Sequence, residues 1–543
     1  MSVASSLFGR VLGLPPARTA AVRVQRDIEI PMADGQRPLA DRYHPADDSG
    51  APLVLIRSPY GRSGAYGLMA RIIAERGYQV LALSLRGTSG SGGRFDGFIM
   101  DPDDTPATLA WLRAQPWFPG AMATWGTSYL GYVQWELARQ PMPEWKAAII
   151  QDAPSEFYHS FMYPGGAFAL GNALGWVQTV HTMFRTQESL VRQLVASLSA
   201  PRRQRRAVAQ LPLNDVDRAA VGEHVSYFQQ WIQHPDPDDY WARMDHRGNV
   251  DNMPPIVHLA GGWYDFFLPG MLADHAALRH AGRQVRLLVG PWSHGRGLNT
   301  RVFWRETFTV LDHALRGEGD LPAVAVRLFV SGAKQWMDFN EWPPPGYRAS
   351  PWFLQPSGGL APASPQDSPP SRFRYDPADP TPTVGGAIVA VSAGPKDNRQ
   401  IETRADVLTF TSEPLERDIE TIGPVAAEIH IRSTRPHTDV FARLCDVAPN
   451  GRSTNLCDGI VRLRADAATT VDEVSCAQVK LWPVGHRFLR GHSIRLQVSS
   501  GAHPRYVRNL GTGEQLGAAM LPADQEIFHD PQHPSAVLLP QGG

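Results

Sequence analysis

Short apolar runs alternate with helix-like segments between residues 53 and 150, and this rhythm restricts the possible folds more than any other feature of the sequence. Four runs rich in Val, Ile, Leu and Ala predict buried strands at residues 53–56, 79–83, 121–125 and 147–150. Segments with helical patterning lie between them, at residues 66–76, 104–115 and 129–139. Strands separated by helices form βαβ units, so the sequence predicts an α/β fold with a mostly parallel sheet.

The rhythm changes after residue 154. The next segment has long helical patterns and aromatic clusters without clear strands, and strand-like runs resume at residues 256–259 and 285–289. We therefore interpret it as a helical insertion that interrupts one sheet. Residues 343–400 are rich in Pro, Gly, Ser and Asp, which predicts loop-heavy connecting sequence. Beyond residue 405, short alternating runs predict a β-sandwich or jelly roll. The expected segments are a first core part, a helical cap, a second core part and a C-terminal β domain, at residues 1–154, 155–245, 246–350 and 351–543.

Composition excludes several classes of protein. The 543-residue chain has a formal net charge of -1, and its basic run at residues 202–206 is interpreted as a solvated helix end, so no nucleic-acid partner is expected. No apolar run reaches the roughly 18 residues of a membrane helix, so no membrane association is expected. The N-terminus lacks a long apolar stretch, which favours a cytoplasmic protein. Three cysteines do not make a disulfide framework, and we expect three buried thiols at Cys445, Cys457 and Cys476.

The sharpest local motif is Gly-Thr-Ser-Tyr-Leu-Gly at residues 126–131, which follows a predicted strand and opens a predicted helix. A serine in such a turn presents its hydroxyl above the edge of the sheet, and the turn is tight enough to require glycine. The motif spaces its second glycine one residue further from Ser128 than the usual G-x-S-x-G pattern does. Its strand–turn–helix context makes Ser128 the candidate nucleophile.

A serine hydroxyl needs a base that takes its proton and an acid that orients the base. Asp265 follows one later strand and His294 follows the next, which is the order serine, acid, histidine found in α/β-hydrolases. Both lie just past strand ends, where open α/β sheets build their sites. Taken alone, Asp265 would be interpreted as a helix N-cap for residues 268–280 and His294 as a solvated loop residue. His258 lies within a strand and is interpreted as a core histidine.

The oxyanion of an acyl-transfer reaction needs preorganised donors. The backbone N–H of Tyr129 is one candidate because it follows the nucleophile, and the hydroxyl of Tyr60, in the loop after an early strand, is the other. Without the triad, Pro-Tyr-Gly at residues 59–61 would be interpreted simply as a turn. Phe266 and Phe267, beside the acid, are equally interpretable as substrate contacts or as core packing at the start of a helix.

Together these residues resemble the CocE/NonD hydrolases, a group that includes bacterial cocaine esterase, α-amino-acid ester hydrolases and X-Pro dipeptidyl-peptidases. The resemblance rests on the serine motif, on Ser-Pro-Tyr, Gly-Trp-Tyr-Asp and Gly-Pro-Trp-Ser-His, and on C-terminal motifs at residues 58–60, 262–265, 290–294, 439–447 and 504–509. It implies an α/β-hydrolase core with an inserted helical cap and a C-terminal jelly roll. It assigns the nucleophile, acid and base to Ser128, Asp265 and His294, and oxyanion roles to Tyr60 and Tyr129. The family usually has Asp where Ser84 stands, which leaves the partner of Arg86 open.

The expected activity is hydrolysis of small-molecule esters or amides through an acyl-enzyme, with no metal or cofactor required. An aminoacyl-directed enzyme, either an α-amino-acid ester hydrolase or an X-Pro peptidase, is the nearest alternative. It would need carboxylates that receive a substrate ammonium, for which Asp152 and Glu156 are candidates, although a structural role suits both. A non-catalytic binding protein is the alternative of another class. The sequence indicates no oligomeric state.

Overall fold

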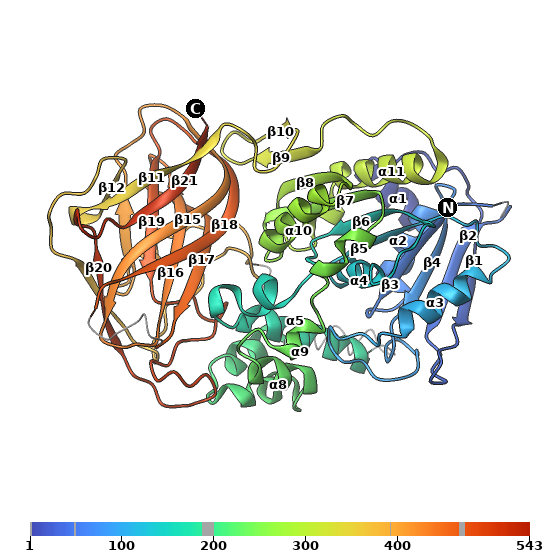
Figure 1. Ribbon diagram of the computed structural model, residues 1–543, viewed down its shortest axis with the longest axis horizontal. Helices are drawn as coiled ribbons and strands as arrows, with labels where there is room; N and C mark the ends of the chain where they lie inside the picture. The colour runs from blue at the N-terminus through green and yellow to red at the C-terminus, as the bar shows by residue number, and fades with distance from the viewer. Residues whose placement is uncertain (1–2, 48–49, 187–199, 391, 466–472, 543) are drawn as a thin grey trace.

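The structure is a computed structural model that describes residues 3–47, 50–186, 200–390, 392–465 and 473–542. Its N-terminal part is built on a ten-stranded sheet with the order β1-β2-β4-β3-β5-β6-β7-β8-β9-β10 (Figure 1). The strands from β3 to β9 are parallel. The strands of this sheet are Val22–Glu29, Leu39–Pro45, Leu53–Ser58, Gln79–Ser84, Met122–Thr127, Trp145–Gln151, Ile256–Tyr264, Gln284–Ser293, Val326–Val330 and Gln335–Phe339, numbered β1 to β10.

The predicted strands are confirmed because they lie at the centre of this sheet. Every residue of β3, β4 and β5 is buried, and most are apolar, as is typical of parallel strands that are covered on both faces. The sequence analysis missed β1 and β2, which pair antiparallel at one edge, and the antiparallel β9–β10 pair at the other. Most residues of β1 are exposed and several are charged, so no apolar run marks this edge strand.

Helices cover both faces of the sheet, and the predicted helices of the first part are present with small shifts at their ends. The helix α4 begins directly after β5, and α10 begins shortly after β7, so both start at the carboxyl ends of strands. The helices of this part are Val3–Leu12, Gly64–Ala74, Asp104–Arg113, Tyr129–Leu137, Leu268–His280 and Arg301–Arg316, labelled α1, α2, α3, α4, α10 and α11.

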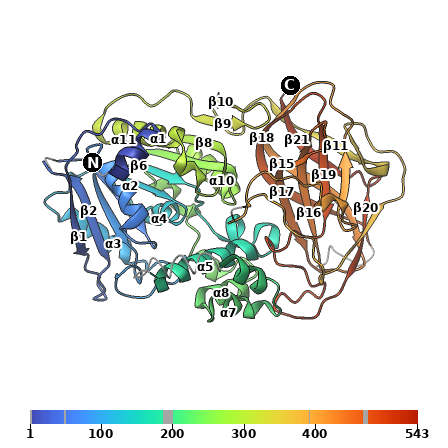
Figure 2. The same ribbon diagram turned by 180° about the vertical axis from the view of Figure 1, so that it is seen from behind.

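The chain between β6 and β7 forms a helical cap. No strand occurs among the described residues of 155–245, as expected, and residues 187–199 of the predicted insertion lie outside the described part. The arginines of the basic run are helical and exposed, which agrees with a solvated helix. In both views the cap lies below and between the two β structures (Figures 1 and 2). Its helices include Leu170–Thr186, Val216–Val221, Ser226–Gln233 and Asp239–Ala242, labelled α5, α7, α8 and α9; residues 200–207 are also helical, and a π-turn spans Tyr158–Met162.

The C-terminal part is a β structure of eleven strands. Residues 343–400 are not only connecting sequence as expected, because β11, β12 and β13 lie there. Pro351 lies within β11 and Gly359 within β12, and because both residue types are typical of turns, these strands were not predicted. The strands are Tyr347–Gln355, Gly359–Ala361, Ser371–Tyr375, Leu408–Thr411, Ile419–Ser433, Thr438–Val447, Ser453–Leu463, Ser475–Phe488, Ser493–Ser499, Ala523–Phe528 and Ala536–Gly542, numbered β11 to β21.

The three cysteines are free thiols, and one differs from the expectation. Cys445 and Cys457 are buried, but Cys476 is exposed. Cys476 is the second residue of the long strand β18, and its side chain projects from the solvent face of that strand. Among the described residues, no helix combines the length and apolar character needed to cross a bilayer.

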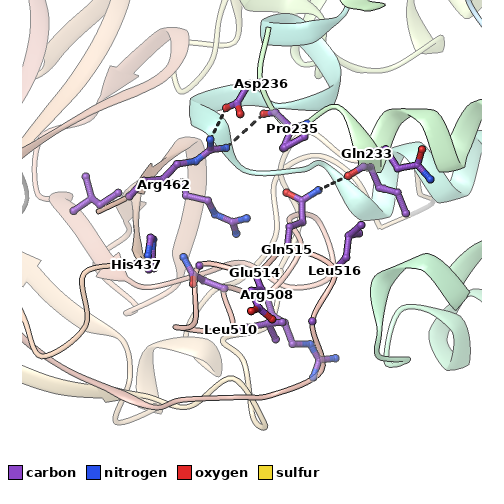
Figure 3. Close-up of a pocket in the computed structure, with 16 residues that line it drawn as sticks. Gln233, Pro235, Asp236, His437, Arg462, Arg508, Leu510, Glu514, Gln515 and Leu516 are labelled. Atoms are coloured by element: carbon purple, nitrogen blue, oxygen red, sulfur yellow. Dashed lines mark hydrogen bonds and ion pairs between the residues drawn. The ribbon is translucent and has the colours of Figure 1, made fainter. Parts of the chain in front are cut away.

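The cap and the C-terminal β structure meet around a cavity of about 680 Å³ (Figure 3). Arg464 forms an ion pair with Asp236 across this seam. The side-chain amide of Gln515 donates to the hydroxyl of Tyr163 at 2.9 Å and to the backbone carbonyl of Ile232 at 3.3 Å. These bonds fix the cap against the C-terminal part.

Candidate active site

Ser128 stands at the turn between β5 and α4 in a strained backbone conformation. Its φ is 57° and its ψ is -125°, a region that costs free energy for a residue with a side chain. Its backbone N–H donates to the carbonyl of Gln151 at the end of β6, at 2.8 Å. This geometry is that of a nucleophile elbow, which lifts the hydroxyl out of the sheet edge.

The two glycines of the serine motif explain its unusual spacing. A Cβ on Gly126 would lie 2.2 Å from the backbone carbonyl oxygen of Leu130, so β5 and the first turn of α4 approach too closely for any other residue. A Cβ on Gly131 would lie 2.6 Å from the Cβ of Ala153, in the chain after β6. The second glycine is therefore required at residue 131, where α4 meets its neighbour, and Leu130 is free to be large.

The structure brings the three predicted triad residues together. His294 Nε2 lies 2.9 Å from Ser128 Oγ, and His294 Nδ1 lies 2.7 Å from Asp265 Oδ2. A carboxylate only accepts hydrogen bonds, so Nδ1 carries the hydrogen and Nε2 is left as the acceptor for the serine hydroxyl. This is the tautomer a general base requires. Asp265 is only 1% exposed, whereas Ser128 and His294 are half-buried and reachable from solvent.

Asp265 is oriented by a second contact at the start of α10. Its Oδ1 accepts the backbone N–H of Phe267 at 2.7 Å, so the carboxylate serves the helix start and the imidazole together. The rings of Phe266 and Phe267 are buried, with centroids 4.4 and 5.5 Å from that of His294. Both phenylalanines thus pack against the base, and contact with a substrate stays a prediction.

The side chains of the two residues expected to supply oxyanion donors pack against each other. Tyr129 is the first residue of α4, and the amide of a first helical residue has no carbonyl partner within the helix. The Tyr129 hydroxyl donates to the carbonyl of Gly97 at 2.6 Å, which anchors the side chain and leaves the amide to act. The Tyr60 and Tyr129 rings meet edge to face at 6.3 Å.

The hydroxyl of Tyr60 is oriented by a tryptophan that the sequence analysis did not single out. Trp176 Nε1, from α5 of the cap, donates to Tyr60 Oη at 2.9 Å. Because the phenol oxygen accepts this bond, its hydrogen is directed elsewhere and stays available to a substrate. Burial raises the pKa of Tyr60 to about 12, partly opposed by the Trp176 bond, so the phenol remains a neutral donor at physiological pH.

Removing the Trp176 donor should weaken this arrangement. In W176F the Tyr60 hydroxyl loses its fixed orientation, and we expect kcat for ester hydrolysis to fall about threefold to tenfold, the value of one neutral hydrogen bond. W231F is the matched control, because the rings of Trp231 and Trp176 are 5.8 Å apart in one cluster while Tyr60 bonds only Trp176 of the two. Steady-state kinetics on both variants make the comparison, and equal losses would contradict an orienting role.

The two carboxylates considered for binding an ammonium group are already engaged. Asp152 Oδ2 accepts the backbone N–H of Gly295 at 2.8 Å. Glu156 accepts the backbone N–H groups of His159 at 3.0 Å and Ser160 at 2.9 Å, which fixes the π-turn of the cap. Both side chains are buried. Their structural interpretation therefore fits better than substrate binding.

Two other residues are placed as follows. Arg86 pairs with Asp104 and Asp34, so its guanidinium finds carboxylates although Ser84 stands in the usual aspartate position. Ser84 instead accepts a hydrogen bond from Arg62 at 3.2 Å. His258 is fully buried in the core, where burial lowers its pKa to about 4, as suits a core histidine.

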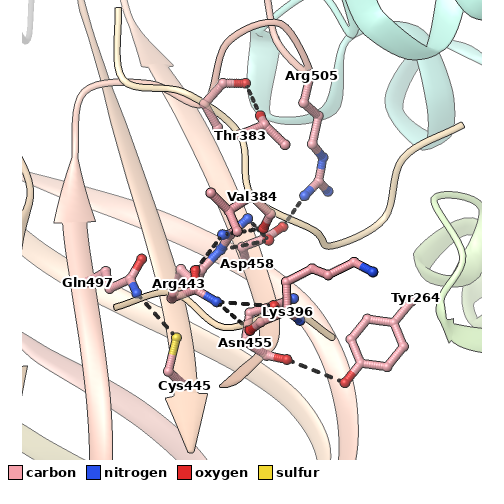
Figure 4. A network of polar contacts seen from close by, with 12 residues as sticks. Tyr264, Thr383, Val384, Lys396, Arg443, Cys445, Asn455, Asp458, Gln497 and Arg505 are labelled. Atoms are coloured by element: carbon pink, nitrogen blue, oxygen red, sulfur yellow. Dashed lines mark hydrogen bonds and ion pairs between the residues drawn. The ribbon is translucent and has the colours of Figure 1, made fainter. Parts of the chain in front are cut away.

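The C-terminal β structure contacts the acid loop directly. Trp482 Nε1, from β18, donates to the backbone carbonyl of Asp265 at 3.0 Å. The Tyr264 hydroxyl donates to the carbonyl of Asn455 at 3.3 Å (Figure 4). The two residues on either side of the β7 end are therefore held by two separate strands, β17 and β18.

A buried ionic cluster of Arg443, Asp458 and Arg505 (Figure 4) lies next to Trp482. The guanidiniums of Arg443 and Arg505 both bind Asp458, and Arg505 lies 4.9 Å above the Trp482 ring. Burial raises the pKa of Asp458, but the two guanidiniums outweigh it and lower that pKa overall. The carboxylate stays charged, so the cluster forms a rigid base for the indole.

Known proteins resemble this chain in sequence and in fold. Residues 34–296 match the X-Pro dipeptidyl-peptidase (S15 family) model, and residues 320–538 match the X-Pro dipeptidyl-peptidase C-terminal non-catalytic domain. Cocaine esterase of Rhodococcus sp. (strain MB1 Bresler) is 32% identical, over 95% of this chain and 98% of the relative. The chain belongs to the CocE/NonD family of serine hydrolases.

The fold of this CocE/NonD hydrolase agrees with solved structures. An aminopeptidase from a marine sediment Thaumarchaeota archaeon is 22% identical, with a TM-score of 0.83 over 98% of this chain and 99% of that chain. An α-amino acid ester hydrolase is 21% identical, with a TM-score of 0.82 over 97% and 98%. A CocE/NonD family hydrolase from Staphylococcus aureus is 16% identical, with a TM-score of 0.70 over 95% and 93%. The expected architecture, an α/β-hydrolase fold with a jelly-roll-like C-terminal domain, is confirmed, and so is the expectation of an enzyme.

Proposed function

We propose that this hydrolase cleaves small-molecule esters through an acyl-enzyme formed on Ser128. One observation carries the proposal: His294 joins Ser128 Oγ at 2.9 Å to Asp265 Oδ2 at 2.7 Å. Both distances are within reach for proton transfer in the resting enzyme. The identity to cocaine esterase supports an ester as substrate.

In the first half-reaction, Ser128 Oγ attacks the ester carbonyl carbon while His294 Nε2 takes the hydroxyl proton. The negative charge that develops on the carbonyl oxygen is stabilised by the Tyr129 amide and the Tyr60 hydroxyl. Asp265 stabilises the imidazolium. The bond to the leaving alcohol then breaks, and His294 returns its proton to the alcohol oxygen, leaving the acyl group on Ser128.

In the second half-reaction, water replaces the alcohol. His294 takes a proton from the water, whose oxygen attacks the acyl carbon, and the same two donors stabilise the second oxyanion. The bond between Ser128 Oγ and the acyl carbon then breaks, and His294 returns its proton to Oγ, which releases the carboxylic acid and restores the serine hydroxyl.

The proposed substrate route is a cavity of about 1080 Å³ on whose wall Tyr60 lies. The helix α5 of the cap and the loop at Val389 border the same cavity, so core, cap and C-terminal part contribute to it. Its volume is near the upper limit of small-molecule pockets, which measure roughly 300–1,000 Å³. Neither nucleic acid nor a membrane is proposed as a partner, and a cytoplasmic location stays a prediction from the sequence.

An aminoacyl-directed activity has less support from the site. A buried substrate ammonium needs a partner carboxylate, and Asp152 and Glu156 already accept hydrogen bonds from the backbone. Without a charge partner, an aminoacyl substrate should be disfavoured by about two orders of magnitude. Because residues 34–296 match the S15 family model, aminoacyl and Xaa-Pro substrates are included in the experiment below.

The proposal is tested by measuring kcat/KM for p-nitrophenyl acetate, butyrate and benzoate alongside aminoacyl esters and Xaa-Pro anilides. We expect the simple esters to be preferred, and a preference for Xaa-Pro anilides would overturn the assignment. Labelling with a fluorophosphonate, followed by peptide mapping, should place the adduct on Ser128. A protein that only binds ligands would not react.

A further inference from the structure

Asp152 occupies an unusual position directly behind the triad. It follows β6, and its backbone N–H donates to the carbonyl of Ala260 in β7 at 2.8 Å. Its φ is 49°, in the left-handed region that few residues with side chains adopt. The side chain is only 2% exposed, so the strained backbone points a carboxyl group into the protein.

The Asp152 carboxyl lies between the loop that carries the base, after β8, and the acid, after β7. Its Oδ2 accepts the backbone N–H of Gly295, the residue after His294, at 2.8 Å, and the side-chain N–H of Gln151 at 3.2 Å. The carboxyl group also lies beside that of Asp265. One carboxylate oxygen from each of Asp152 and Asp265 and one ring nitrogen of His294 all lie within 4.8 Å of one another.

Two buried carboxyl groups this close together repel each other when both are charged, so one of them favours its protonated form. Asp265 accepts the N–H of Phe267 with one oxygen and that of His294 with the other, so it is the ionised member. In the described part of the chain, no arginine or lysine forms an ion pair with either carboxyl group. Burial first, and then the charge of Asp265, raise the pKa of Asp152 well above its usual value. Among the residues that the structure describes, the titratable groups Asp265 and His294 lie beside it.

We propose that Asp152 is a positioning residue of the triad, whose protonated carboxyl donates to Asp265 while it accepts the N–H of Gly295. It thereby fixes the acid and the backbone of the base relative to each other, acting through them and not on the substrate. This role rests on the proposed esterase mechanism. No charge is added next to Asp265, so the carboxylate keeps its full attraction for the imidazolium.

Kinetics on two Asp152 variants test the role. In D152A both contacts are lost, and we expect kcat for p-nitrophenyl acetate to fall at least about tenfold with KM little changed, the cost of roughly one buried hydrogen bond to a charged group. In D152N the amide can donate to Asp265 and accept from Gly295, so most of the lost kcat should be restored. D152A with wild-type kcat, or D152N as impaired as D152A, would overturn the proposal.

Asp274 provides a matched control. It is a buried carboxyl of α10 that accepts the N–H of Ser155 at 2.8 Å, and burial raises its pKa to about 7. D274A should lower the Tm but leave kcat near wild type, because Asp274 does not contact the triad. If D274A lost as much kcat as D152A, general destabilisation would explain both and the positioning role would fall. An active S128A variant would overturn the esterase mechanism itself, a result separate from any of these.

The pH dependence of stability tests the proton on Asp152. A carboxyl with a raised pKa in the folded state must bind a proton on folding, so its contribution to stability falls as the pH rises above its unfolded pKa near 4. D152N has no such proton. The Tm of D152N should therefore rise relative to wild type between about pH 5 and pH 8. A constant difference across this range would mean that Asp152 is ionised and would overturn the proposal.

Discussion

Replacing Ser128 by alanine should lower kcat for p-nitrophenyl acetate by about 10⁴-fold or more. The alanine has no nucleophilic oxygen, so His294 has no proton to accept and no acyl-enzyme can form. Any remaining rate would come from the oxyanion donors and from binding alone. Steady-state kinetics with enough enzyme to detect slow turnover measure the effect, and KM should change little.

The S128A variant should fold normally, because Ser128 contributes no side-chain cap to α4. Its Tm should stay close to that of the wild type, and its fluorophosphonate labelling should disappear. Esterase activity near the wild-type level, with the substitution verified by mass spectrometry, would contradict the assignment of the nucleophile.

Removing the hydroxyl of Tyr60 should have the second largest effect. In Y60F one of the two oxyanion donors is absent, and we expect kcat to fall about 10²- to 10³-fold with a small change in KM, because the bond forms mainly in the transition state. Trp176 Nε1, which donates to Tyr60 Oη at 2.9 Å, would also lose its acceptor. The measurement is kcat and KM for acetate and benzoate esters.

Tyr132 offers a control for the loss of a buried hydroxyl. It lies in α4, and its hydroxyl donates to the carbonyl of Phe98 at 3.2 Å, away from the triad. Y132F should change the Tm more than kcat. If Y60F retained wild-type kcat, the second oxyanion donor would have to be sought elsewhere.

The centre of the fold was predictable from the sequence because its strands are buried on both faces. The runs that became β3 to β6 are mostly apolar, as is typical of strands buried on both faces, and this signal can be recognised without knowing the pairing partners. Edge strands lack this signal: β1 carries charged residues, and β11 contains Pro351, which a strand tolerates at few positions. Their strand structure depends on pairing, with the neighbouring β2 for β1 and with the distant β21 for β11.

The triad could be proposed because each member directly follows a strand of the same parallel sheet. Strand ends bring Ser128, Asp265 and His294 to one edge whatever the length of sequence between them. The tryptophans that support the site do not follow strands in this way, so no sequence pattern indicates them. Trp176 and Trp482 were two of 15 tryptophans, and only the packing of the cap and of β18 brings them to the site. The position of Asp152 after a core strand was visible, but its direction toward Asp265 was not.

The hydrogen bond from the Trp482 indole to the carbonyl of Asp265 means that the hydrolase core and the C-terminal β structure must evolve together at this contact. A chimera that joined the core and cap of one relative to the C-terminal half of another could fold into two sound units and still turn over slowly. The indole and the loop that receives it would have to be inherited together. Chimeras in which Trp482 and the Asp265 loop come from different relatives should therefore be stable but have a low kcat. Exchanges confined to strands remote from β18 should leave kcat unchanged.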